Sequence, residues 1–110
     1  MPEDAPRSSL LEVIAQPGPA AALALVGELD PGTAPILQAR LLELADDPAV
    51  TSVAVDLARI TFLDSSGVRA IVTGSEALRA RGAPLTLTAP NPNVRRVLEV
   101  TGLAQLVTVD

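Results

Sequence analysis

The run Leu63-Asp64-Ser65-Ser66-Gly67 holds the residues of this chain best suited to chemistry. It follows a valine-rich run, residues 50–57, and precedes apolar residues at helical spacing, so two hydroxyls are expected where a strand ends and a helix begins. The first N–H groups of a helix have no partner within it, and the helix dipole leaves partial positive charge there. A phosphate on such a hydroxyl is favoured locally and changes the surface offered to a partner. The run therefore predicts a switch rather than a catalyst.

A simpler role explains the same residues. Ser is a preferred helix cap, worth about 1 kcal/mol over Ala, and Asp64 can cap as well. On local sequence alone, capping is a complete explanation for Ser65 and Ser66. Capping and phosphate acceptance are compatible roles.

The composition removes most catalytic chemistry. The chain has no His, no Cys and no Lys, and all eight basic residues are Arg. There is accordingly no Ser-His-Asp relay, no usual zinc ligand set, and no lysine for a Schiff base or a P-loop. We expect no enzyme activity, no metal and no cofactor. A carboxylate-based hydrolase using Glu28, Asp30 or Asp64 is a rival hypothesis, but a turn leading into a capped helix explains Glu28 and Asp30 better.

Charge and hydropathy exclude further classes. A net charge of −5 and a single aromatic residue, Phe62, disfavour a duplex-binding surface and a base-stacking platform, so we expect no direct nucleic-acid contact. The longest apolar run, residues 20–26, is far shorter than the about 20 residues needed to span a bilayer, so no membrane insertion is expected. Residues 1–8 are acidic and proline-rich, which predicts a disordered lead and a cytoplasmic protein.

The remaining residues, 9–110, predict a single α/β domain with a mostly parallel sheet, an N-terminal antiparallel hairpin and three to four helices, in the order β-β-α-β-α-β-α-β. The expected strands are residues 9–15, 21–26, 50–57, 85–88 and 106–109. The expected helices begin at residue 34 or 35, span about 66–80, and follow residues 89–93. Thr33 or Asp30 is expected to cap the first helix.

Two of the expected connections, residues 27–33 and 58–66, follow strands of the parallel sheet. Connections at the carboxyl ends of such strands usually carry the binding site, and these two are expected side by side. Phe62 is expected to be a core anchor beneath the second one. If it is fully buried, Phe62→Ala should cost about 3–5 kcal/mol.

Several motifs in register resemble the STAS domain family, and within it the bacterial anti-sigma factor antagonists. The resemblance covers nearly the whole chain, from about residue 9 to residue 110. It is carried by Gly27-Glu28-Leu29-Asp30, Val55-Asp56-Leu57, Phe62-Leu63-Asp64-Ser65-Ser66-Gly67-Val68, Asn93-Val94-Arg95-Arg96-Val97-Leu98 and Thr101-Gly102-Leu103.

The resemblance implies partner switching. An unphosphorylated antagonist binds an anti-sigma factor and frees its sigma factor. The anti-sigma factor, commonly an ATP-dependent serine kinase, phosphorylates the antagonist and is released, and a phosphoserine phosphatase resets the cycle. The implied acceptor is Ser65, with Asp64, Ser66, Gly67 and Asp30 in the switch loop and partner surface.

The chain departs from the family pattern at Arg69, where many relatives have a small residue. Arg69 is expected to adjust partner choice or to place a cation near Ser65. The alternative function is a STAS module that binds a nucleotide or lipid, or that serves as a scaffold or as a transporter accessory subunit.

Overall fold

The computed structural model describes residues 10–110. The expected disordered lead and the expected start of the first strand at Ser9 lie outside the described residues. The elements, in chain order, are β1 (Leu11–Gln16), β2 (Ala20–Leu29), α1 (Ala34–Asp46), β3 (Ser52–Leu63), α2 (Ser65–Arg79), β4 (Leu85–Thr88), α3 (Pro92–Val100), a 3₁₀ turn (Leu103–Gln105) and β5 (Thr108–Val109). The predicted element order is confirmed.

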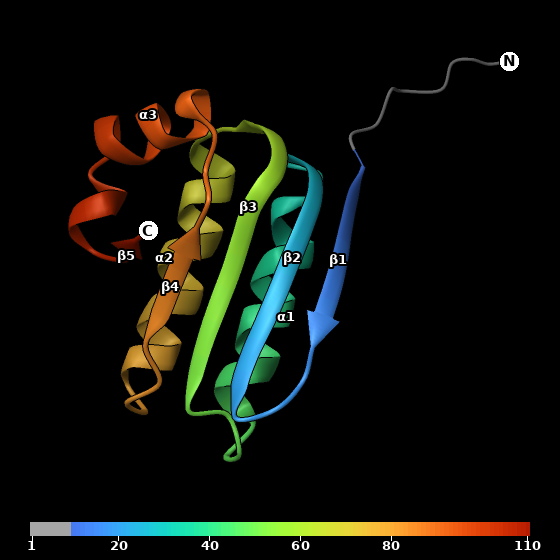
Figure 1. The fold of residues 1–110 in the computed structure, drawn as a ribbon, viewed down its shortest axis with the longest axis vertical. Helices are drawn as coiled ribbons and strands as arrows, with labels where there is room; N and C mark the ends of the chain where they lie inside the picture. The colour runs from blue at the N-terminus through green and yellow to red at the C-terminus, as the bar shows by residue number, and fades with distance from the viewer. Residues whose placement is uncertain (1–9) are drawn as a thin grey trace, which may run out of the picture.

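The strands form one five-stranded sheet in the order β1-β2-β3-β4-β5. β1 and β2 pair antiparallel across the turn that contains Gly18, and the remaining pairs are parallel. This confirms the N-terminal hairpin and the mostly parallel sheet. β1 is an edge strand and lies beside β2 at one side of the molecule (Figure 1).

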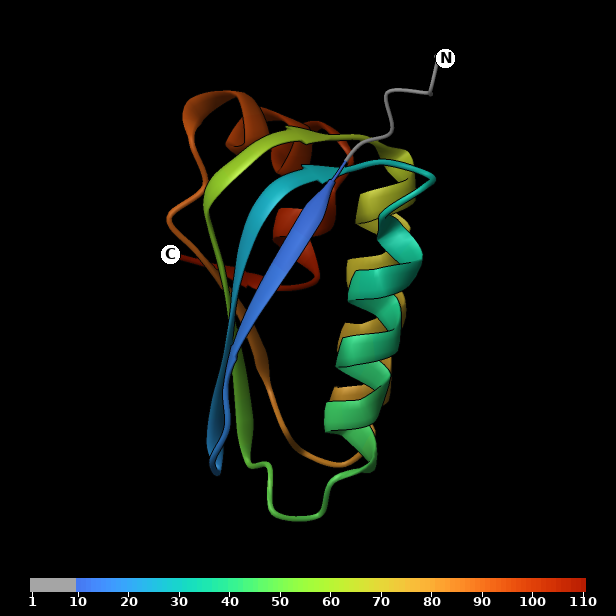
Figure 2. The same ribbon diagram turned by 90° about the vertical axis from the view of Figure 1, so that its right-hand side faces the viewer.

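The core lies between the sheet and the helices α1 and α2. Both helices cover the same face of the sheet and run side by side along it (Figure 2). The strands supply the sheet side of the core and the helices the other side. The fully buried large side chains include Leu25, Leu29, Leu37, Leu41, Leu57, Ile60, Ile71, Leu78, Leu87, Leu98 and Leu103.

A close helix contact holds α1 against α2. A Cβ added to Gly74 of α2 would lie 2.4 Å from the Leu41 Cδ1 atom and 2.6 Å from its Cβ. The absence of a side chain at Gly74 therefore lets the two helix backbones approach. This contact fixes the relative position of the two helix N-termini, which matters for the site.

The third strand extends beyond its predicted end. Residues 58–63 were expected to be a connection, but they continue β3 up to Leu63. The pairing with β2 shifts twice along this stretch, between Ala24 and Val26 and between Gly27 and Glu28 of β2. Because β3 holds an extra residue at each shift, its buried residues change from every second position to every third, at Leu57, Ile60 and Leu63. The pattern of alternation therefore ends before the strand does.

Two smaller expectations also need correction. β2 runs three residues past its predicted end, to Leu29. The expected strand over residues 106–109 is reduced to Thr108–Val109, because a 3₁₀ turn occupies the preceding residues.

Phe62 is not a core residue. Its side chain is 48% exposed, although it directly precedes the buried Leu63. The second strand shift places Phe62 opposite Glu28 instead of over the core. The condition for a loss of 3–5 kcal/mol in Phe62→Ala is therefore not met.

Candidate functional site

The β3–α2 junction is organised by Asp64. Asp64 is the N-cap of α2, and its Oδ1 accepts hydrogen bonds from the backbone N–H of Ser66 at 2.8 Å and of Gly67 at 3.3 Å. Its carbonyl oxygen accepts from the N–H of Val68 at 3.1 Å. One aspartate thus satisfies three amides of the first turn, those of Ser66, Gly67 and Val68, of which the first two would otherwise lack partners. Of the candidate caps, the carboxylate takes the role and the serines do not.

Because Asp64 is the cap, the two serine hydroxyls are not needed to start the helix. Ser65 is the first residue of α2 and is exposed, and Ser66 is half-buried. Neither hydroxyl makes a hydrogen bond with another residue of the described chain. The Ser65 side chain is therefore open to solvent at the tip of the helix.

Gly67 brings the tip of α2 against the ends of two strands. A Cβ at this position would lie 2.5 Å from the Leu63 Cδ1 atom and 2.8 Å from the Leu29 Cβ atom. Such distances are well inside van der Waals contact, so only glycine fits without displacing its neighbours. The predicted place of Gly67 in the switch loop thus has a packing reason.

The β2–α1 junction lies directly beside the β3–α2 junction. Leu29 and Leu63 are partners in the parallel pairing of β2 and β3, and the Leu29 carbonyl accepts a hydrogen bond from the N–H of Asp64 at 3.1 Å. The expectation that these two connections lie side by side is confirmed.

Asp30 shapes this neighbouring turn. Its Oδ1 accepts from the N–H of Gly32 at 2.9 Å and of Thr33 at 3.1 Å, and its carbonyl oxygen accepts from the N–H of Ala34 at 2.8 Å. Thr33 occupies the N-cap position of α1, but its side chain makes no capping hydrogen bond. Asp30 and Asp64 thus both accept hydrogen bonds from backbone amides. Within residues 10–110, no cluster of acidic side chains could hold a metal ion.

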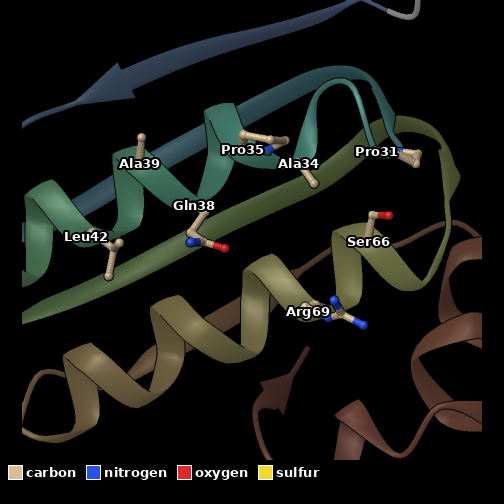
Figure 3. A pocket seen from close by; sticks show the side chains of 8 residues that line it. All are labelled: Pro31, Ala34, Pro35, Gln38, Ala39, Leu42, Ser66 and Arg69. Atoms are coloured by element: carbon tan, nitrogen blue, oxygen red, sulfur yellow. The ribbon is translucent and has the colours of Figure 1, made fainter.

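A groove of about 400 Å³ lies between α1 and the N-terminal part of α2. Figure 3 shows side chains of α1 projecting toward α2, with Ser66 facing them from the first turn of α2 and Pro31 at the end of the groove. The wall formed by α1 and the turn before it is largely apolar, and the wall formed by α2 is polar. The lining residues are Pro31, Ala34, Pro35, Gln38, Ala39, Leu42, Ser66 and Arg69.

Of the predicted site residues, the structure brings Ser66 and Arg69 together on this groove. Ser65, Asp64 and Gly67 form the helix tip directly beside it, and Asp30 lies in the adjoining turn. Arg69 is exposed and makes no hydrogen bond or ion pair with any residue in the range 10–110. The guanidinium is therefore available to a ligand or partner.

Comparison with known proteins identifies the family. A family model described as "Mlab, STAS domain" matches residues 13–108 of the chain. The chain belongs to the STAS domain family.

Two relatives of this STAS domain are anti-sigma factor antagonists. The anti-sigma-B factor antagonist of Listeria monocytogenes is 28% identical over 77% of the chain and 74% of that protein. The anti-sigma F factor antagonist of Lysinibacillus sphaericus is 30% identical over 72% of the chain and 68% of that protein. Both relatives are named as antagonists of an anti-sigma factor.

Solved structures agree with these relatives. The anti-sigma factor antagonist SpoIIAA in its unphosphorylated form matches with a TM-score of 0.77 at 26% identity, over 92% of this chain and 88% of that chain. An anti-sigma factor antagonist from Mycobacterium paratuberculosis matches with a TM-score of 0.77 at 26% identity, over 97% and 89%. SpoIIAA of Bacillus in the phosphorylated form also matches, with a TM-score of 0.70 at 25% identity over 92% and 91%.

The α1 side of the groove was missed by the sequence analysis. Gln38 lies outside the buried stripe of α1, and no role was predicted for that side of the helix. Gln38 and Leu42 lie four residues apart and continue from the buried Ala34 at the same spacing, beside the core residues Leu37 and Leu41. That spacing was the available signal.

Within residues 10–110 of the STAS domain, no helix is both long and apolar enough to cross a membrane.

Proposed function

We propose that this STAS domain is an anti-sigma factor antagonist whose binding is controlled by phosphorylation of Ser65. The unphosphorylated domain binds an anti-sigma factor, and the phosphorylated domain releases it. The names of the relatives support the role, as does the similarity to SpoIIAA in both phosphorylation states. The observation that carries the assignment to Ser65 is its exposed hydroxyl, left uncommitted because Asp64 caps the helix.

The docking surface in this proposal is the tip of α2 together with the groove beside it. Asp64 and Gly67 hold the tip in place, and Ser66 and Arg69 contribute polar groups along the groove. The apolar wall from α1 offers surface whose burial stabilises a complex, at about 25 cal/mol per Å². Asp30 supports the neighbouring turn.

Phosphorylation weakens such a complex without refolding the domain. A phosphoserine adds roughly −1.5 to −2 charges at neutral pH. The N–H groups of Ser66 and Gly67 already bind Asp64, so they offer this charge little compensation. Burying a charge that is not fully compensated in an interface costs several kcal/mol, and each 1.4 kcal/mol changes the affinity about tenfold.

The partners in this cycle are an anti-sigma factor of the ATP-dependent serine kinase class and a phosphoserine phosphatase. Because the cycle consumes ATP and acts on a sigma factor, its place is the cytoplasm. The STAS domain itself serves as substrate and binding partner, with no catalytic step of its own.

The test uses a purified anti-sigma factor of the serine kinase class from the same genome, with ATP. One phosphate should appear on Ser65, located by mass spectrometry of peptides. Ser65→Ala should accept no phosphate and keep its affinity for the kinase, whereas Ser65→Asp should bind it at least tenfold more weakly.

Two matched variants control for the neighbouring hydroxyl and for charge. Ser66→Ala should still accept one phosphate on Ser65. Gln16→Glu adds one negative charge at the far end of β1 and should leave the affinity unchanged. Phosphate on another residue, or equal affinities of Ser65→Asp and Gln16→Glu, would rule out Ser65 as the switch. Binding of a nucleotide or lipid in place of the kinase would favour a different role for the domain.

A further inference from the structure

The cation nearest in sequence to Ser65 on α2 is Arg69, four residues further along the helix. Residues at this spacing are neighbours on a helix surface, with Cβ atoms about 5–6 Å apart. Long helical side chains also lean toward the helix N-terminus. In Figure 3 the Arg69 guanidinium extends toward the N-terminal end of α2, where Ser65 begins the helix.

Arg69 has no competing partner among residues 10–110. The guanidinium groups of Arg79 and Arg81 donate hydrogen bonds to backbone carbonyls, those of Leu106 and Val50 respectively. Arg69 makes no such bond and no ion pair with a residue of the described chain. Pairing with a new anion would therefore break no existing interaction.

The other charged groups facing Ser65 cannot neutralise a phosphate. Asp64 directly precedes it, and Asp30 lies in the adjoining turn, so both nearby carboxylates are repulsive. The N–H groups of Ser66 and Gly67 are already bonded to Asp64. Arg69 is the only arginine in the first two turns of α2, and its planar guanidinium matches phosphate oxygens well.

We infer that Arg69 binds the phosphate of phosphorylated Ser65 within the same helix. This inference rests on the proposed function for the identity of the acceptor residue. Since Arg69 also lines the groove, pairing with the phosphate withdraws the guanidinium from the groove part of the docking surface. Phosphorylation then changes two features of that surface together, adding a charge at Ser65 and removing a donor from the groove.

The test installs phosphoserine at position 65 during translation, so that no kinase is required. The second pKa of the phosphate, roughly 6 in the absence of partners, is followed by ³¹P NMR as pH is varied. A nearby cation favours the dianion and lowers this pKa. The pKa should be lower in the otherwise natural chain than in Arg69→Gln, by about 0.2–0.4 pH units for an exposed pair at this spacing.

Arg79→Gln is the matched control. It removes the same charge from the same helix at a position about 21 Å from Ser65 along the helix axis, at 1.5 Å per residue, which is beyond the screening length of about 8 Å at physiological salt. Its phosphate should titrate as in the unsubstituted chain. Equal pKa values in Arg69→Gln and the unsubstituted chain, or equal changes in both glutamine variants, would overturn the pairing. Partner binding plays no part in this measurement, so its result is independent of the kinase-binding test.

Discussion

The two junctions at the carboxyl ends of β2 and β3 begin with the same pair of residue types, but they differ in the hydrogen bonding of the hydroxyl that follows. Each strand ends in a leucine followed by an aspartate, and Leu29 and Leu63 are partners in the sheet. In each junction the aspartate Oδ1 accepts two backbone N–H groups, at Asp30 and at Asp64. The leucine–aspartate pattern therefore positions both turns.

The hydroxyls that follow differ in what surrounds them. Thr33 is buried, and its Oγ1 donates to the Glu28 carbonyl at 2.6 Å and accepts from the Asp30 N–H at 3.0 Å. Ser65 is exposed and has no such bond within the described chain. One hydroxyl stabilises its turn, and the other remains available for modification. A hydroxyl beside a capping aspartate is thus a candidate site only where the fold leaves it unbonded and exposed.

The largest expected difference is in the free energy of unfolding between alanine variants of the glycines in the two junctions. In Gly67→Ala the new methyl group meets Leu63 and Leu29 at 2.5 and 2.8 Å, and the second contact is to a Cβ atom that moves only with its backbone. We expect a loss of about 2–3 kcal/mol in the free energy of unfolding, measured by urea denaturation. Gly32→Ala meets only an Asp30 carboxylate oxygen, at 3.4 Å, and should change stability by less than about 0.5 kcal/mol. Similar losses in both variants would contradict the tight packing at the α2 tip.

The next largest expected difference is in the stability lost when each of the two hydroxyls is removed. Thr33→Val keeps the shape of the side chain but leaves the Glu28 carbonyl and the Asp30 N–H without their partner, which should cost about 2 kcal/mol. Ser65→Ala removes an exposed hydroxyl that makes no hydrogen bond in the described chain, so its stability should stay within about 0.5 kcal/mol of the unsubstituted chain. Thermal and urea unfolding of the two variants side by side measure the difference. If Ser65→Ala proves the more destabilised of the two, the Ser65 hydroxyl has a structural role and the comparison fails.

Much of this arrangement could be predicted from the sequence because it depends on local patterns. The proline and glycine residues predicted the turn of the hairpin, and the spacing of apolar residues predicted the helices. The alternation of strands and helices predicted the parallel sheet. The same order implied that the two junctions would be neighbours, since parallel strands end at the same edge. The choice of Asp64 over Ser65 as the cap was open, because both residue types are good caps.

The errors arose where pairing between strands decides the outcome. The two shifts between β2 and β3 lengthen β3 and turn Phe62 away from the core, and neither shift is visible in β3 alone. The presence of the groove depends on the distance between α1 and α2, and the contact of Gly74 with Leu41 sets that distance. Such features depend on residues far apart in the sequence, so local periodicity does not reveal them.

The smallest expected effect tests whether the carboxylate of Asp64 is what releases Ser65 from capping. Asp64→Ala leaves the N–H groups of Ser66 and Gly67 without an acceptor, and we expect a loss of about 1 kcal/mol in the free energy of unfolding. Asp64→Asn keeps an oxygen that can accept both bonds, so it should lose no more than about half as much. Amide hydrogen exchange should be faster at these two positions in Asp64→Ala alone, because their protection comes from this side chain. Unchanged exchange in Asp64→Ala would mean that another group caps α2, and the serine hydroxyls would then be the first candidates.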